Sequence, residues 1–133
     1  FVVPIMADEA VHSPEDAMDL ARQGAADVLA LKISKSGGPY EVLRTAAVGD
    51  AAGMALYGGT MLEGSLGTVA AAHAFATLPR LEWGTELFGP LLLVDDIVQQ
   101  RPAYQEFSMT LPTGPGLGLA LDEEKLRRYR RDR

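Results

Sequence analysis

Four short apolar runs recur along the chain at intervals of about 26 residues, close to the length of a strand, a helix and two short loops. They are Val2-Val3-Pro4-Ile5-Met6, Val28-Leu29-Ala30-Leu31, Met54-Ala55-Leu56-Tyr57 and Leu81-Glu82-Trp83-Gly84. The runs are apolar throughout rather than alternating, as in strands of a parallel sheet covered by helices. We therefore expect four strand–helix units.

Helical patterns separate these runs. Ser13-Pro14-Glu15-Asp16 predicts a helix start, with a serine cap, a proline in the first turn and acids at the positive end of the helix dipole. Gly24 predicts the end of that helix. A second helix is predicted from about Pro39 to Gly53 and a third between Gly64 and Pro79.

The last third of the chain has a different pattern. Residues 91–94 suggest a short apolar helix or turn, and residues 104–111 an extended segment. Residues 112–118 are too rich in glycine and proline for a regular element. Residues 122–129 predict a short terminal helix capped by Asp122.

Two α/β architectures fit the repeat: a doubly wound sheet, or part of a (β/α)₈ barrel of the TIM type. The doubly wound sheet predicts a glycine-rich phosphate turn after its first strand, whereas Ala7-Asp8-Glu9 stands there. A barrel predicts polar residues at the carboxyl end of every strand, because its active site is built there. Such residues follow all four runs: Asp8 and Glu9, then Lys32, then Gly58-Gly59-Thr60 and Glu63, then Glu86.

Length and composition narrow the class of protein. A complete barrel takes about 250 residues, so four units in 133 residues make half of one. The net charge of −6 argues against a nucleic-acid binder, and no apolar run approaches the ~20 residues of a membrane span. The absence of cysteine excludes a disulfide scaffold and a thiolate metal site. We expect a soluble, cytoplasmic protein.

Asp8 is the strongest candidate metal ligand, because Mg²⁺ and Mn²⁺ prefer carboxylate oxygens. A helix-capping or loop carboxylate explains it equally well, and one carboxylate is not a site. Lys32 shares a strand face with Val28 and Ala30, so on a barrel interior its ammonium would lie at the mouth as an acid or base. We expect Lys35 to be a surface lysine.

Two acids follow the later strands. On the fourth predicted strand Glu82, Gly84 and Glu86 share a face, with Glu86 at the active end. Glu63 either belongs to the site or opens the next helix, where its charge favours the helix dipole.

Several segments in order resemble the second half of a muconate cycloisomerase, a family of the enolase superfamily. They are Pro4-Ile5-Met6-Ala7-Asp8-Glu9, Leu31-Lys32-Ile33-Ser34-Lys35-Ser36-Gly37-Gly38, Tyr57-Gly58-Gly59-Thr60-Met61-Leu62-Glu63-Gly64, Gly84-Thr85-Glu86-Leu87-Phe88-Gly89-Pro90 and Pro112-Thr113-Gly114-Pro115-Gly116-Leu117-Gly118. The resemblance covers essentially the whole chain. It implies barrel strands 5–8 in residues 1–100, and in residues 101–133 an extension that packs on the barrel and an N-terminal capping domain.

The resemblance also implies roles for the candidate residues. Asp8 would be the third metal ligand, Lys32 and Glu86 catalytic residues, and Glu9, Thr60 and Glu63 substrate-binding or orienting groups. The cofactor would be Mn²⁺ or Mg²⁺. The implied reaction converts cis,cis-muconate or a chloromuconate to muconolactone through an enolate-like intermediate, in catechol breakdown.

The resemblance further implies partners: a small dicarboxylate substrate, the other half of the barrel, the capping domain, and further copies in a homo-oligomer. With two metal ligands and a lysine pair missing, we expect no turnover from this chain alone. Gly64 and Ala72-His73-Ala74-Phe75-Ala76-Thr77 lean toward the chloromuconate type.

Three other interpretations stay open. One is another enolase-superfamily activity: o-succinylbenzoate synthase, N-acylamino acid racemase or dipeptide epimerase. A second is a non-catalytic half-barrel with a structural role. The third is a doubly wound binding domain, which the order of strands in a structure decides.

Overall fold

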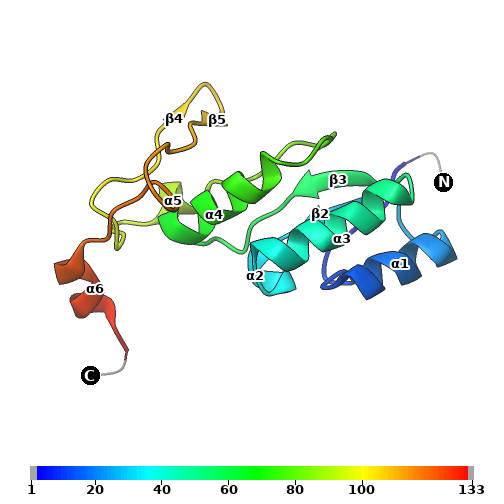
Figure 1. Ribbon diagram of the computed structural model, residues 1–133, viewed down its shortest axis with the longest axis horizontal. Coiled ribbons are helices and arrows are strands. Elements are labelled where there is room, and N and C mark those ends of the chain that lie inside the picture. Colours follow the sequence, from blue (N-terminus) through cyan, green and yellow to red (C-terminus); the bar gives the residue numbers. More distant parts are fainter. Residues whose placement is uncertain (1–2, 132–133) are drawn as a thin grey trace.

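The computed structural model describes residues 3–131 and has a small parallel sheet at its centre (Figure 1). Its strands are β1 (Met6–Ala7), β2 (Val28–Leu31) and β3 (Ala55–Gly58), and they lie side by side in chain order. All pairings are parallel, with Met6 opposite Val28 and Leu29 opposite Leu56. Val2, which begins the first predicted strand, lies outside the described residues.

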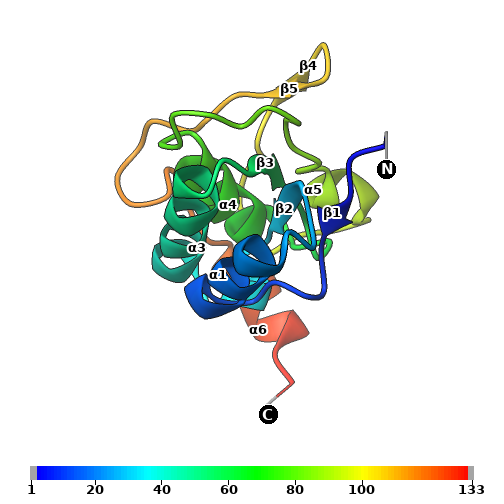
Figure 2. The ribbon, with the colours of Figure 1, turned by 90° about the vertical axis from the view of Figure 1, so that its right-hand side faces the viewer.

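Three helices lie next to one another on one face of this sheet (Figures 1 and 2): α1 (Pro14–Gln23), α3 (Pro39–Ala51) and α4 (Ser65–Phe75). The core between sheet and helices includes Leu29, Leu31 and Leu56, each at most 1% exposed. Parallel strands in chain order, with their connecting helices on one face, form an arc of a barrel. A doubly wound sheet reverses its strand order and carries helices on both faces, so that interpretation is wrong.

Local signals explain where the helices start and stop. Ser13 caps α1 by accepting from the Asp16 N–H, while the Asp16 side chain accepts from the Ser13 N–H. Gly24 ends α1 at φ 56°, a left-handed conformation that suits glycine. The three predicted helices are confirmed.

A short helix, α2 (Ile33–Ser36), follows β2 and was not predicted. Lys32 is its N-cap residue, and Gly37 ends it at φ 87°. One helical turn is too short to show an apolar period, which is why the sequence pattern does not reveal it. Its consequence is to bring Lys35 back toward the strand ends.

The fourth predicted strand is wrong. Residues 81–84 form a turn, Gly84 has φ 69°, and the one parallel bridge along this segment of the described chain joins Gly58 and Thr85. The Glu82 carboxylate accepts the Leu56 N–H, a donor that a regular fourth strand would bind through a carbonyl. Glu82, Gly84 and Glu86 therefore do not share a strand face.

The rest of the chain follows α4, and its first helix packs against α4. It contains α5 (Gly89–Leu92), the antiparallel pair β4 (Tyr104–Gln105) and β5 (Ser108–Met109), and α6 (Glu123–Tyr129), which Asp122 caps as predicted. Asp96 accepts from both the N–H and the hydroxyl of Ser65, the first residue of α4. Lys125 and Tyr129 of α6 both donate to Asp95. In the predicted extension of residues 101–133, residues 132 and 133 lie outside the described chain.

Within residues 3–131 no helix has the length and hydropathy needed to cross a membrane.

Candidate functional site

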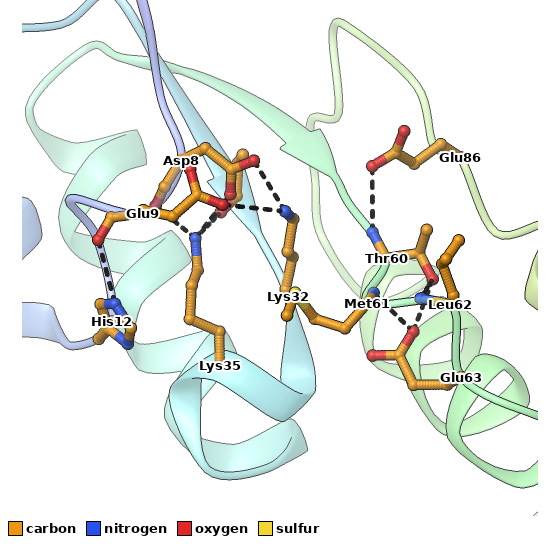
Figure 3. Close-up of polar contacts among 11 residues, drawn as sticks. Asp8, Glu9, His12, Lys32, Lys35, Thr60, Met61, Leu62, Glu63 and Glu86 are labelled. Carbon is orange, nitrogen blue, oxygen red and sulfur yellow. Dashed lines mark hydrogen bonds and ion pairs between the residues drawn. The ribbon is translucent and has the colours of Figure 1, made fainter.

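The carboxyl ends of β1 and β2 bring Asp8 and Lys32 together (Figure 3). Asp8 follows β1 and Lys32 follows β2, so the parallel register places both at the same edge of the sheet. Lys32 Nζ donates to Asp8 Oδ2 at 2.7 Å and lies 3.9 Å from Glu9 Oε1. The Lys32 side chain is 8% exposed, whereas that of Glu9 is 83% exposed.

Lys35 also binds Asp8, so the expectation of a surface lysine is wrong. Its side chain is 5% exposed, and its Nζ lies 3.0 Å from Asp8 Oδ1. It donates in addition to the backbone carbonyls of Asp8 and, at 3.2 Å, of Ala30. An ammonium has three protons, and these three oxygens satisfy them all. We call Asp8, Lys32 and Lys35 the Asp8 cluster.

The charges in the Asp8 cluster keep Asp8 ionised. Burial is the largest single effect on its pKa and raises it, but the hydrogen bonds and charges of Lys32 and Lys35 together outweigh burial. The pKa of Asp8 is therefore lowered from its ordinary value of 3.8. In the described chain, Asp8 Oδ2 is the one acceptor within hydrogen-bond distance of Lys32 Nζ, which leaves Lys32 protons for another molecule.

The loop after β3 forms a second polar group, beside the Asp8 cluster (Figure 3). The Thr60 N–H donates to Glu86 Oε1 at 3.2 Å. Glu63 Oε2 accepts from Thr60 Oγ1 at 2.6 Å and from the Met61 N–H at 2.8 Å, and Glu63 Oε1 accepts from the Ser34 hydroxyl. Glu63 does not cap α4, because the cap position is Gly64.

Burial raises the pKa of Glu63, but the hydrogen bonds from Ser34 and Thr60, together with those from backbone N–H groups, outweigh it. The pKa of Glu63 is therefore lowered from its ordinary value of 4.5. Its carboxylate is ionised at neutral pH, with hydrogen bonds to both oxygens.

Tyr57 was not singled out from the sequence. It lies opposite Ala30 in the sheet, on the strand face that also carries Gly59. Burial, followed by a hydrogen bond to Glu86 and the negative charges of Glu86 and Asp8, raises the pKa of Tyr57 to about 12. The two-residue alternation along β3 could have identified it, since it precedes Gly59 by two positions.

Asp8 fits a divalent cation as one ligand, because it offers a hard carboxylate oxygen at a strand end and its side chain is 36% exposed. Each Asp8 oxygen accepts from one lysine and keeps a second lone pair for a cation. Residues 3–131 contain no group of three His, Asp or Glu side chains arranged to hold a metal ion. The described chain therefore offers one ligand and not a complete site.

A cavity of about 820 Å³ lies apart from the Asp8 cluster, between α4 and the β4–β5 pair. Apolar side chains dominate its wall, among them Phe75, Leu87 and Met109. Glu86 also lines the cavity, and it is the residue that binds the Thr60 N–H of the loop after β3. Its lining is mostly apolar, and it does not reach Asp8 or Lys32.

Known proteins are similar to this chain in sequence and in fold. A family model described as enolase C-terminal domain-like matches residues 1–125. The muconate cycloisomerase 1 of Pseudomonas putida is 62% identical over 128 residues, which are 96% of this chain and 34% of that protein. A chloromuconate cycloisomerase of Pseudomonas sp. (strain P51) is 47% identical over 129 residues, 97% of this chain and 35% of that protein.

The solved structure of a muconate lactonizing enzyme from Pseudomonas fluorescens, complexed with muconolactone, matches with a TM-score of 0.93 and 60% identity. The match covers 97% of this chain and 35% of that one. The chain thus spans about a third of the length of the relatives it matches. Its parallel strands are part of a (β/α) barrel, and the chain belongs to the enolase C-terminal domain-like family as a C-terminal part of the muconate cycloisomerase type.

Proposed function

We propose that this chain supplies the segment of strands 5–8 in the barrel of a cycloisomerase that converts cis,cis-muconate or a chloromuconate to muconolactone. Strands β1, β2 and β3 would be the first three of these, and the fourth would be reduced to the bridge between Gly58 and Thr85. The observation that carries the proposal is the buried Lys32 ammonium. Asp8 holds it at a strand end and accepts one of its protons, so the other protons can bind a substrate. The greater identity to the muconate enzyme favours muconate over chloromuconate as the substrate, against the indication from Gly64.

The proposed reaction is an intramolecular addition. One substrate carboxylate oxygen bonds to a carbon of a double bond, and the electron pair of that double bond moves toward the other carboxyl group. An ammonium group of the enzyme then adds a proton to the carbon next to that carboxyl group and regains a proton from the solvent. The lactone monoanion contains the same atoms as the singly protonated substrate, so the reaction is an isomerisation. A divalent cation, Mn²⁺ or Mg²⁺, would stabilise negative charge on the substrate carboxylate when bound.

The residues of this chain would act around that substrate. Lys32 would stabilise the developing negative charge through its ammonium, while a lysine on the second barrel strand, outside this chain, would supply the proton. Glu86 would contact the substrate as well, and the Thr60 N–H, which donates to its carboxylate, would hold it in place. Asp8 would supply one ligand of the metal, and Glu9 would act on Lys32 and Asp8 through its charge.

The remaining ligands, the other barrel strands and the capping domain would come from the rest of such an enzyme, which we expect to be a homo-oligomer. This chain alone should therefore not turn over muconate. The proposed function can be tested in a hybrid enzyme, in which this chain replaces the matching 128-residue segment of the Pseudomonas putida muconate cycloisomerase.

The test is muconate consumption by this hybrid enzyme with Mn²⁺. We expect turnover, and a loss of at least about 100-fold in Asp8→Asn and Lys32→Met, the loss typical of removing a group that acts in the transition state. Lys125→Met is the matched control, because Lys125 also pairs with an aspartate at 2.7 Å but far along the chain. A folded hybrid without activity, or full activity of Lys32→Met, would refute the proposal.

A further inference from the structure

The loop from Thr60 to Glu63 is held in an unfavourable backbone conformation. Leu62 has φ 62°, a left-handed value that is uncommon for a residue with a side chain. Met61 and Leu62 are each 55% exposed, so burial of their side chains does not hold the loop. Polar contacts must therefore keep its shape.

Glu63 provides these contacts. Its carboxylate accepts from Thr60 Oγ1 and the Met61 N–H within the loop, and from the Ser34 hydroxyl of α2 outside it. Thr60 Oγ1 in turn accepts the Leu62 N–H at 3.0 Å. One carboxylate thus connects the loop to the short helix that carries Lys35.

Close packing fixes the backbone around Glu63. A Cβ atom on Gly89 would lie 2.1 Å from the Glu63 carbonyl oxygen, and one on Gly67 would lie 2.7 Å from Glu63 Cβ. The Thr68 hydroxyl donates to the same carbonyl at 3.0 Å. Glu63 therefore sits between α4 and α5 with little room to move.

We propose that Glu63 is a positioning residue: it shapes the loop so that the Thr60 N–H points at Glu86, and it does not touch the substrate. Both of its oxygens already accept hydrogen bonds, whereas Glu86 receives the Thr60 N–H from the loop that Glu63 folds. The catalytic consequence rests on the proposed function; the contacts do not.

Amide hydrogen exchange in this chain tests the contacts without any substrate. Glu63→Ala should accelerate exchange of both the Met61 and the Thr60 N–H by at least about 10-fold, because loss of structure in a loop exposes its amides. Glu63→Gln should leave both protected, since its amide oxygen accepts from Thr60 and Met61 while its NH₂ donates to Ser34. Ser34→Ala, a milder change at an exposed residue, should accelerate both amides less.

Glu82→Ala is the matched control for Glu63→Ala, because Glu82 also accepts a backbone N–H, that of Leu56, at the other end of β3. It should leave Thr60 unchanged. Faster exchange at Met61 with an unchanged Thr60 would mean that Glu63 folds only its own turn, and would overturn the proposal.

Kinetics of the hybrid enzyme test the route through Glu86. If Glu63 acts through Glu86, Glu63→Ala combined with Glu86→Gln should be no slower than Glu86→Gln alone, within about 2-fold, whereas independent effects multiply. Glu63→Gln should retain kcat. Multiplying effects, or an equal loss in Glu63→Gln and Glu63→Ala, would overturn the proposal, the latter by showing that the charge itself is used. A hybrid without muconate turnover would refute the proposed function, and the exchange data would still decide the role of Glu63.

Discussion

The side chain of Lys32 lies against the backbone of Gly59. A Cβ atom on Gly59 would lie 2.8 Å from Cε and 2.9 Å from Cγ of Lys32, closer than real Cβ contacts come. The Gly59 N–H donates to the Leu31 carbonyl at 2.8 Å, which fixes the two backbones side by side. The missing side chain at position 59 thus creates the space through which Lys32 reaches Asp8.

Gly59→Ala should therefore displace the Lys32 ammonium without removing any charged group. A displacement of about 1 Å at a reacting group costs about 100-fold in rate, and we expect a loss of that size in kcat of the hybrid enzyme. Gly64→Ala is the control, because the nearest atom to its added methyl group is 3.3 Å away and its φ of −66° suits alanine. Equal activity of the two variants would show that Lys32 does not depend on the space at Gly59.

Lys35→Met tests whether Lys35 holds the strand ends together. It removes the donor to Asp8 Oδ1 and leaves the Asp8 and Ala30 carbonyls without this partner. We expect the free energy of unfolding of the hybrid enzyme to fall by about 2 kcal/mol, measured by urea denaturation. Lys125→Met breaks an ion pair whose side chains are each 35% exposed, and should cost less than about 1 kcal/mol. Similar losses in the two variants would contradict a special role for Lys35.

Tyr57 predicts a specific dependence on alkaline pH. Its pKa is raised to about 12 from an ordinary 10.0, so the folded state holds the phenolic proton more tightly than the unfolded state. Its contribution to stability is fully present below pH 10 and is lost as the pH rises from 10 through about 12. In an ultraviolet titration of this chain, Tyr57→Phe should remove phenolate absorbance that develops near pH 12. If the absorbance lost in Tyr57→Phe instead develops near pH 10, Tyr57 does not have this environment.

Features set by neighbouring residues could be predicted from the sequence. The Ser13 and Asp16 capping pair, the Gly24 stop and the apolar runs of β2 and β3 follow from rules that act over a few positions. The same rules place Asp8 and Lys32 at strand ends, and parallel pairing then brings them together. Because both residues directly follow apolar runs, the sequence pattern was sufficient to predict them as site candidates.

Features set by distant partners could not be predicted. The segment at residues 81–84 has the composition of a strand, but a side chain, Glu82, takes the Leu56 N–H in place of a backbone carbonyl. Lys35 resembles a surface lysine in sequence, and its burial depends on Asp8, 27 positions away. Ser34 and Glu63 are 29 positions apart. Local propensity contains no information on such contacts.

The Asp96 carboxylate caps α4 from outside the helix, and its removal should destabilise the packed part of the fold. Asp96 is 6% exposed, and its Oδ2 accepts from Ser65 N at 2.9 Å and from Ser65 Oγ at 2.7 Å. Ser65 is fully buried, so Asp96→Ala leaves a donor without partner or water at the start of a core helix. We expect a loss of about 2 kcal/mol in the free energy of unfolding, measured by urea denaturation of the hybrid enzyme.

Asp122→Ala provides the comparison, because Asp122 caps α6 through the N–H groups of Glu124 and Lys125 at 3.1 Å. No residue of α6 is buried, so this helix can fray while the core stays folded. The variant should change the free energy of unfolding by less than about 0.5 kcal/mol, while amide exchange within α6 becomes faster. If Asp96→Ala and Asp122→Ala lower the free energy of unfolding equally, then burial of the capped helix end does not determine how much stability the loss of a cap removes.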